Sequence, residues 1–377
     1  MREGYRVDQN RTMKQKIAGI RVYPFDIKMA EPFRIATMEV DGSPNVLVRI
    51  ETSEGIVGWG EASPLHSIVG ETQSVVIAAA LELRRLMLGK DALEIVERVA
   101  EMDEFLPHNT TAKSAFDMAL HDIAGKAAGM PVYQLLGGKP RPMETDLTIG
   151  LCHPKEAAKK AQEVLAKGFR IIKVKLGAGL KDDIRRLNAV REAAPNATIR
   201  IDANQGWDRV TAIKALSAFE ELDIEFCEQP VRAEDIKGLR EVGGSTTIPI
   251  MADESLFSPA DAIRLIDEEA CPYFNIKLSK SGGICNAMKI AAIAEAAGIR
   301  CMVGCMLESR LGLAAAVHFA RATRCVQFYD LDMCVEHAEE LIDGGMALKN
   351  GAISIKEAPG LGAEPLPEVV DKLVDAA

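Results

Sequence analysis

Beyond Pro140 the sequence repeats one pattern, in which a short apolar segment rich in β-branched residues precedes a longer amphipathic stretch typical of a helix. The strand-like segments follow one another at intervals of 24 to 28 residues, with centres near Thr148, Lys173, Ile201, Phe226, Met251, Asn275, Met302 and Phe328. Repeated strand–helix units build parallel sheets, and eight units at so even a spacing predict a closed barrel rather than an open sheet. The predicted fold class is therefore α/β.

The first 140 residues follow a different pattern. Strand-like runs between Ile17 and Ala62 resemble an antiparallel meander, and stretches with helical apolar spacing follow at residues 74–88 and 112–129. This region is therefore predicted to form an α+β unit. Residues 1–12 precede a second methionine, Met13, and the first strand. We interpret them either as a flexible extension or as an artefact of start-site choice.

Composition excludes several functional classes. The formal net charge is −10 and the basic residues are dispersed, so we expect no nucleic-acid partner. Charged residues interrupt the most apolar region, residues 290–320, and the N-terminus lacks the apolar core of a secretory signal, so we expect a cytoplasmic protein without a membrane partner. The sequence contains no GxGxxG pattern for a nucleotide, and its 8 cysteines, without CxxC spacing, are interpreted as reduced core residues.

Ionisable residues cluster at the carboxyl ends of the predicted barrel strands, where buried strands would otherwise be apolar. They are Lys173, Lys175, Asp202, Glu228, Asp253, Lys277, Asp330 and Asp332. Each alone is explained by a helix cap or a solvated loop, but three carboxylates from neighbouring strands cannot share a barrel mouth without a cation. Oxygen ligands with open positions suit Mg²⁺, whereas the 6 histidines show no paired spacing for zinc.

A hard cation flanked by lysines indicates proton transfer next to a carboxylate. Mg²⁺ that holds a substrate carboxylate can stabilise the enediolate formed when the neighbouring carbon loses its proton. The cation and Lys173 both disfavour the charged form of Lys175, which can then act as a base. Lys277, four strands further round the barrel, would approach the same carbon from the opposite face. Two such bases can invert a stereocentre.

In this order the motifs resemble the enolase superfamily, and in particular its muconate lactonizing enzyme subgroup. The resemblance covers almost the whole chain and rests on GWGEA at 58–62, KVK at 173–175, DAN at 202–204, EQP at 228–230, ADES at 252–255 and NIKLSKSGG at 275–283. It implies a modified TIM barrel, (β/α)7β, at 141–345, an α+β capping domain at 1–140 and a C-terminal segment at 346–377 that returns to the cap. Homo-oligomers are frequent in the family.

The resemblance also implies roles for these residues. Asp202, Glu228 and Asp253 would bind Mg²⁺, Lys175 and Lys277 would form the acid/base pair, and Lys173 would assist electrostatically.

The strand-eight motif Asp330-Leu331-Asp332 distinguishes reactions within the subgroup. It matches the DxD with which dipeptide epimerases bind the free α-ammonium of a dipeptide, and Thr148 is expected near the substrate. The leading hypothesis is therefore an isomerase, a Mg²⁺-dependent epimerase acting on the C-terminal residue of a dipeptide. The alternatives are an o-succinylbenzoate synthase or N-acylamino acid racemase, and a catalytically silent binding barrel.

One position departs from the family pattern. Epimerases of Ala-Glu dipeptides carry an arginine six residues beyond the proline of a PF pair, and here that position is Met38. We therefore expect a non-acidic side chain on the epimerised residue. Glu39, Asp41 and Glu71 favour a cationic side chain, whereas Ile35, Met38 and Ile68 favour an apolar one, and the sequence leaves this choice open.

Overall fold

The computed structural model describes residues 14–376, so the interpretation of residues 1–12 lies outside it. Its largest element is an 8-stranded parallel sheet in which each strand pairs with its neighbour in sequence. The strands are β4 (Leu147–Ile149), β5 (Ile171–Lys175), β6 (Thr198–Asp202), β7 (Ile224–Glu228), β8 (Ile250–Ala252), β9 (Tyr273–Ile276), β10 (Arg300–Gly304) and β11 (Val326–Asp330). Each contains one predicted strand centre, so the α/β prediction is confirmed.

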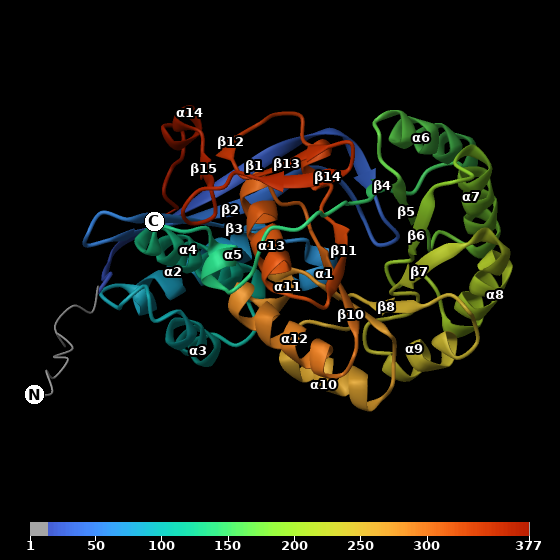
Figure 1. Cartoon of the computed structure of the whole chain (residues 1–377), viewed down its shortest axis with the longest axis horizontal. Coiled ribbons are helices and arrows are strands. Elements are labelled where there is room, and N and C mark those ends of the chain that lie inside the picture. The colour runs from blue at the N-terminus through green and yellow to red at the C-terminus, as the bar shows by residue number, and fades with distance from the viewer. Residues whose placement is uncertain (1–13, 377) are drawn as a thin grey trace, which may run out of the picture.

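Helices follow the first seven strands and cover the outside of the sheet, as Figure 1 shows. They are α6 (Pro154–Ala166), α7 (Leu180–Ala193), α8 (Arg209–Phe219) with η1 (Glu220–Leu222), α9 (Ile236–Gly243), α10 (Pro259–Asp267), α11 (Leu278–Ser281), α12 (Ile284–Ala296) and α13 (Arg310–Ala322). After β11 comes only the short η2 (Met333–Val335). The architecture is thus the expected (β/α)7β barrel.

The first and last strands approach each other without a continuous ladder of hydrogen bonds. The backbone N–H of Asp146, just before β4, donates to the carbonyl of Tyr329 in β11 at 3.4 Å. The Asp332 carboxylate accepts the N–H of Thr148 at 2.7 Å. Side-chain and single backbone contacts therefore close the barrel at this seam.

An antiparallel sheet and short helices form the N-terminal α+β unit, which we call the cap. It contains β1 (Ile17–Arg34), β2 (Glu39–Thr52), β3 (Val57–Ala62), α1 (His66–Val69), α2 (Gln73–Met87), α3 (Ile95–Phe105), α4 (Thr110–Ala128) and α5 (Val132–Leu135). Helix α4 crosses β3 so closely that a Cβ at Gly58 or Gly60 would lie 2.2 or 1.9 Å from an α4 carbonyl oxygen. The glycines of the GWGEA motif therefore permit this contact.

The C-terminal segment runs back along the cap. It contains β12 (Ile342–Gly344), β13 (Met346–Lys349), β14 (Ala352–Ile355), β15 (Ala363–Pro365) and α14 (Pro367–Val370). The N–H of Ala376 donates to the carbonyl of Val22 at 2.8 Å, and the carbonyl of Gly360 accepts the N–H of Val132 at 3.0 Å. In Figure 1 these red strands lie beside the blue strands of the cap.

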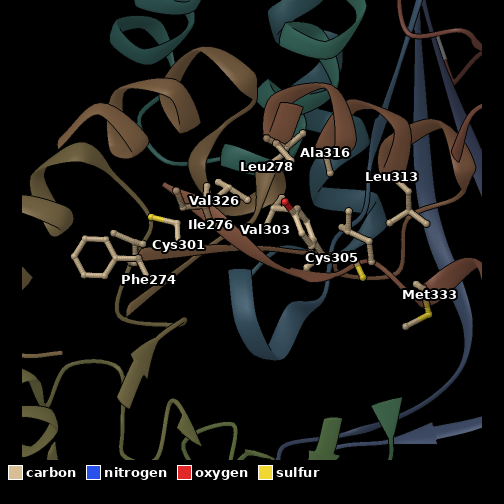
Figure 2. Packing of buried hydrophobic residues seen from close by; sticks show 14 of the residues in the cluster. Phe274, Ile276, Leu278, Cys301, Val303, Cys305, Leu313, Ala316, Val326 and Met333 are labelled. Carbon is tan, nitrogen blue, oxygen red and sulfur yellow. The ribbon is translucent and has the colours of Figure 1, made fainter. Parts of the chain in front are cut away.

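One apolar cluster fills the space between the barrel sheet and its helices and continues into the cap through residues such as Tyr23, Leu47 and Trp59, and a second lies within the cap between β1–β3 and α2–α4. Figure 2 shows part of the first, where Ile276, Val303 and Val326 of the strands face Leu313 and Ala316 of α13. Among residues 14–376, no helix has both the length and the hydropathy that a membrane span requires.

Candidate active site

The carboxyl ends of the barrel strands bring the predicted polar residues to one place. Strand pairing sets Lys175 beside Asp202 and Asp202 beside Glu228, while Asp253 and Lys277 directly follow β8 and β9. All predicted barrel-site residues except the half-buried Thr148 are at most 7% exposed. Charged groups this deeply buried require partners, and each has one at the end of another barrel strand.

The lysines and carboxylates form a connected set of ion pairs. Lys175 Nζ donates to Asp202 Oδ2 at 2.6 Å, and Lys277 Nζ donates to Asp253 Oδ2 at 2.9 Å. Lys173 Nζ contacts two of the carboxylates and lies 2.7 Å from Glu228 Oε2 and 3.2 Å from Asp202 Oδ2. The two predicted bases thus stand on opposite sides of the barrel, with Lys173 between the carboxylates.

The three predicted metal ligands offer only oxygen atoms, which suits Mg²⁺. Within the described residues, Asn204 Oδ1 is buried without a hydrogen-bond donor, and Glu228 Oε2 has only its ion pair with Lys173. Burial and the adjacent Asp202 carboxylate raise the pKa of Glu228 to about 7. A divalent cation would relieve this excess of buried negative charge, so the residues fit the ion. Lysine ammonium groups contact these same carboxylates.

Lys277 is held in its charged form by its neighbours. Burial alone would lower its pKa, but the carboxylates of Asp253 and Glu228 raise the pKa above its ordinary value. Lys277 is therefore protonated in this arrangement, as the proton-donating member of an acid/base pair must be.

Asp330 and Asp332, which lie at and just beyond the end of β11, form a second acidic group, and Lys173 Nζ lies 2.7 Å from Asp330 Oδ2. Together with Cys305 they present ligand atoms that all lie within 4.8 Å of one another. Burial would raise the pKa of Asp330, but Lys173, Lys175 and Lys277 lower it to about 2. Burial and the Asp330 carboxylate raise the pKa of Asp332 to about 7. Asp330 is therefore negatively charged and Asp332 is partly protonated near neutral pH, and together they provide a site for a substrate cation.

An open cavity lies beside these groups. Of the predicted residues, Lys175, Lys277, Asp330, Asp332, Thr148 and Met38 line it. Lys173, Asp202, Glu228 and Asp253 are not part of its lining. The two lysines therefore face the same space as the acidic pair.

Apolar side chains from two cap loops cover this cavity. Ile35, Met38 and Ile68 line it, and the Ser67 hydroxyl donates to Met38 Sδ at 2.9 Å, which joins the two loops. The loop carboxylates Glu39, Asp41 and Glu71 do not line it. Glu71 instead accepts the N–H of Thr111 at 3.4 Å, because Gly70 ends helix α1 in a left-handed conformation with φ 74° and turns the chain away.

Sequence reasoning assigned no role to several residues that support the site. Lys280 donates to a carboxylate oxygen of Asp253 and, at 3.0 Å, to the carbonyl of Asn275. Asn275 Nδ2 donates to Glu228 Oε1 at 2.6 Å. Asn275 could have been found, because it lies two residues before Lys277 and so on the same face of its strand. Lys280 lies in a short helix whose direction the sequence does not show.

Comparison with known proteins agrees with this geometry. Residues 17–137 match the model of the mandelate racemase/muconate lactonizing enzyme N-terminal domain, and residues 156–369 match the enolase C-terminal domain-like model. The chain is 40% identical to an L-Ala-D/L-Glu epimerase of Clostridium acetobutylicum, over 92% of this chain and 98% of the relative. It is also 40% identical to a D-Ala-D/L-Ala epimerase of Cytophaga hutchinsonii, over 92% and 95%.

A solved structure extends the likeness to three dimensions. The dipeptide epimerase from Cytophaga hutchinsonii, complexed with Mg and the dipeptide D-Ala-L-Val, superposes with a TM-score of 0.94 at 39% identity, covering 95% of this chain and 98% of that one. The matched domains together span most of the chain, and the relatives align along nearly their whole length. The chain therefore belongs to the mandelate racemase/muconate lactonizing enzyme family of the enolase superfamily.

Proposed function

We propose that this chain is a Mg²⁺-dependent dipeptide epimerase that inverts the α-carbon of a C-terminal residue with an apolar side chain. One observation carries the proposal: Lys175 and Lys277, four strands apart, line one cavity together with the carboxylates of Asp330 and Asp332. The two lysines supply the proton transfer, and the carboxylates select a substrate with a free ammonium group. Similarity to dipeptide epimerases supports this reading.

In this mechanism the chain's own residues bind the dipeptide at its two ends. Asp330 and Asp332 accept hydrogen bonds from the α-ammonium group, and the C-terminal carboxylate lies toward Asp202, Glu228 and Asp253. Mg²⁺, when bound to these three, supplies positive charge beside the substrate carboxylate and makes the α-proton more acidic.

Proton transfer then needs one lysine on each face of the α-carbon. One of Lys175 and Lys277 takes the proton as a neutral amine, and the other, as an ammonium, returns a proton to the opposite face. Lys173 contacts Asp202, Glu228 and Asp330, and so holds the carboxylates of both subsites in place.

The lining of the cavity supports an apolar substrate side chain. The sequence left a cationic and an apolar side chain open, but of the six cap residues weighed for this choice only the apolar Ile35, Met38 and Ile68 line the cavity. A charged side chain there would lose its hydration without gaining a partner. The similarity itself does not decide this, because the two relatives named above act on different residues.

An o-succinylbenzoate synthase or N-acylamino acid racemase would use the same lysines but a substrate without an ammonium group. Asp330 and Asp332 would then face an uncharged group inside a buried pocket, which is unfavourable. A silent binding barrel would not need two lysines that both line the cavity. The expected homo-oligomer, the cytoplasmic location and the absence of nucleic-acid and membrane partners stay predictions.

The test is to incubate the protein with Mg²⁺ and pooled L,L-dipeptides in D₂O, and to measure single-deuteron mass gains. We expect exchange at the C-terminal residue when it is Val, Leu, Ile or Met, and at least tenfold less when it is Glu or Lys. Exchange confined to Lys or Arg would contradict the apolar assignment. No exchange in any pool, with Mg²⁺ binding shown by calorimetry, would overturn the dipeptide reading.

A further inference from the structure

The segment 305–309, which follows strand β10, forms one wall of the active-site cavity. Cys305, Met306 and Leu307 all line the cavity, and Cys305 belongs to the same cluster as Asp330 and Asp332. Cys305 and Met333, which Figure 2 shows toward one end of the buried cluster, both line the cavity. If the acidic pair binds the α-ammonium, this wall faces the N-terminal residue of the dipeptide.

The cap, and not only the barrel, holds this wall by its backbone. Asn45 Nδ2 donates to the carbonyl of Leu307 at 2.9 Å, and the Ser63 hydroxyl accepts the N–H of Leu307 at 3.0 Å. Side chains from β2 and from just beyond β3 thus bind both the N–H and the carbonyl of Leu307, a residue that lines the cavity. Asn45 and Ser63 are 0% exposed, so water does not compete for these contacts.

Glu61 of the GWGEA motif joins these contacts into one network. Its Oε1 accepts Asn45 Nδ2 at 2.7 Å and the N–H of Ser309 at 2.9 Å. Its Oε2 accepts the Ser309 hydroxyl at 2.6 Å and the N–H of Gly312 at 2.9 Å. Glu61 is 0% exposed, and a Cβ at Gly312 would lie 2.8 Å from Glu308 Cβ and 3.1 Å from Glu61 Oε2, so glycine at 312 leaves room for both carboxylate side chains beside α13.

The barrel holds the same segment from its other side. Glu308 accepts the N–H of Met306 at 2.5 Å and the hydroxyl of Ser279 at 3.2 Å. Side chains therefore bind the N–H groups of Met306, Leu307 and Ser309 and the carbonyl of Leu307. A carboxylate with four donors has no equivalent in glutamine, whose amide NH₂ would face the N–H of Ser309 or of Gly312 and leave it unsatisfied.

We propose that Glu61, acting through Asn45 and Ser309, is a positioning residue that fixes the 305–309 wall against the N-terminal residue of the substrate. The motif's glycines bring β3 against α4, and its glutamate reaches across to the barrel. That the wall faces the N-terminal residue of the substrate rests on the proposed function, whereas that Glu61 fixes the wall rests on the contacts alone. The experiment separates the two.

The first readout needs no activity. The wall carries its own probe, Cys305, and trypsin releases it in the peptide 301–310 together with the fully buried Cys301, an internal reference. Iodoacetamide labelling followed by tandem mass spectrometry gives the rate at Cys305. We expect Glu61→Gln to raise this rate at least tenfold, and Ser63→Ala to raise it less, in the same direction.

The matched control is Asp122→Asn. Asp122 is also 0% exposed and accepts the N–H groups of Trp59 at 3.0 Å and Leu361 at 2.8 Å, but it has no hydrogen bond to the wall. Each variant and the wild type are labelled at the same number of degrees below their own melting temperature, so that a general loss of stability does not affect the comparison. Asp122→Asn is expected to leave the rate at Cys305 within twofold of wild type.

The second readout is kinetic. We expect Glu61→Gln to raise KM for dipeptides about tenfold, with kcat changed less than threefold, because the lysines do not contact the wall's cap partners. An unchanged rate at Cys305 in both Glu61→Gln and Ser63→Ala, or equal labelling in Asp122→Asn, overturns the positioning role. A wild-type protein that exchanges no dipeptide proton refutes the proposed function, while the labelling result still decides the role of Glu61 in the wall.

Discussion

Asp332 accepts a hydrogen bond of 2.7 Å from the backbone N–H of Thr148, and so links the end of the last barrel strand to the first. The same carboxylate lines the active-site cavity beside Asp330. Its position is therefore fixed by the closure of the barrel, and a substrate cation meets an acceptor that needs no rearrangement.

Asp332→Asn should weaken dipeptide binding strongly. A hydrogen bond to a charged group contributes about 1.5 to 3 kcal/mol, so we expect KM to rise about 10- to 150-fold. Exchange on N-acetylated amino acids, which have no ammonium group, should change little. Steady-state kinetics on both substrates measures this. The control is Asp343→Asn, an exposed carboxylate whose side chain is 65% exposed and pairs with Lys356.

Dipeptide binding should also depend on pH through the same residue. Because burial and Asp330 raise the pKa of Asp332 to about 7, the free protein takes up a proton there as the pH falls through 7. A protonated Asp332 cannot form the ion pair, so KM should rise from pH 8 to pH 6 with Mg²⁺ kept saturating. Asp332→Asn should remove this rise. A profile that is the same in both proteins would contradict the assignment.

Each catalytic lysine should serve one face of the α-carbon. Lys175→Met and Lys277→Met should each lower epimerisation about 10²- to 10⁴-fold, the usual contribution of general acid–base catalysis. In D₂O each variant should retain measurable exchange on one of the two epimers only, and the two variants should retain opposite epimers. Mass spectrometry of separately supplied L,L and L,D dipeptides measures this, and equal loss on both epimers would argue against the two-base mechanism.

Met38→Arg should change which side chain is accepted. It places a guanidinium at the position where epimerases of Ala-Glu dipeptides carry arginine, inside the cavity that Ile35 and Ile68 also line. We expect kcat/KM to rise for Ala-Glu and to fall for Ala-Leu, so that the ratio of the two values increases at least 100-fold. Met38→Leu, which keeps an apolar side chain, should leave the ratio within threefold.

His318, far from the reaction, should make the fold sensitive to acid. It is 0% exposed, its Nδ1 accepts the N–H of Tyr133 at 3.1 Å, and its Nε2 lies 3.1 Å from the carbonyl of Leu361. Burial lowers the pKa of His318 to about 4, below the value of about 6.5 in an unfolded chain. The neutral ring therefore contributes full stability above pH 6.5, and this contribution is lost as the pH falls toward 4.

Complete loss would amount to about 3 kcal/mol, since each pKa unit corresponds to about 1.4 kcal/mol. Urea unfolding at pH 7.5 and at pH 5 should show a smaller pH effect in His318→Gln than in wild type. His337, whose pKa burial also lowers to about 4, remains in both proteins and cancels in the comparison. An identical pH effect would show that His318 is not the sensitive group.

The barrel could be predicted from sequence because strand spacing and the polar residues at strand ends are local patterns. Lys173, Asp202 and Glu228 lie where period-two alternation in their strands places them. The cap loops could not be predicted in this way. Ile68 and Glu71 are three residues apart, yet one lines the cavity and the other pairs with Thr111, because the left-handed Gly70 reverses the chain between them.

The cap meets the barrel in two ways that follow from separate parts of its sequence. Its centre, where α4 lies on Gly58 and Gly60, leads to the Glu61 contacts, whereas Ile35 and Met38 lie on a loop and Ile68 lies in the short helix α1. Different segments of the chain therefore determine the reaction and the choice of substrate. Exchanging residues 35–38 and 65–70 between relatives should transfer the preferred substrate while the proton-transfer rate stays that of the recipient barrel.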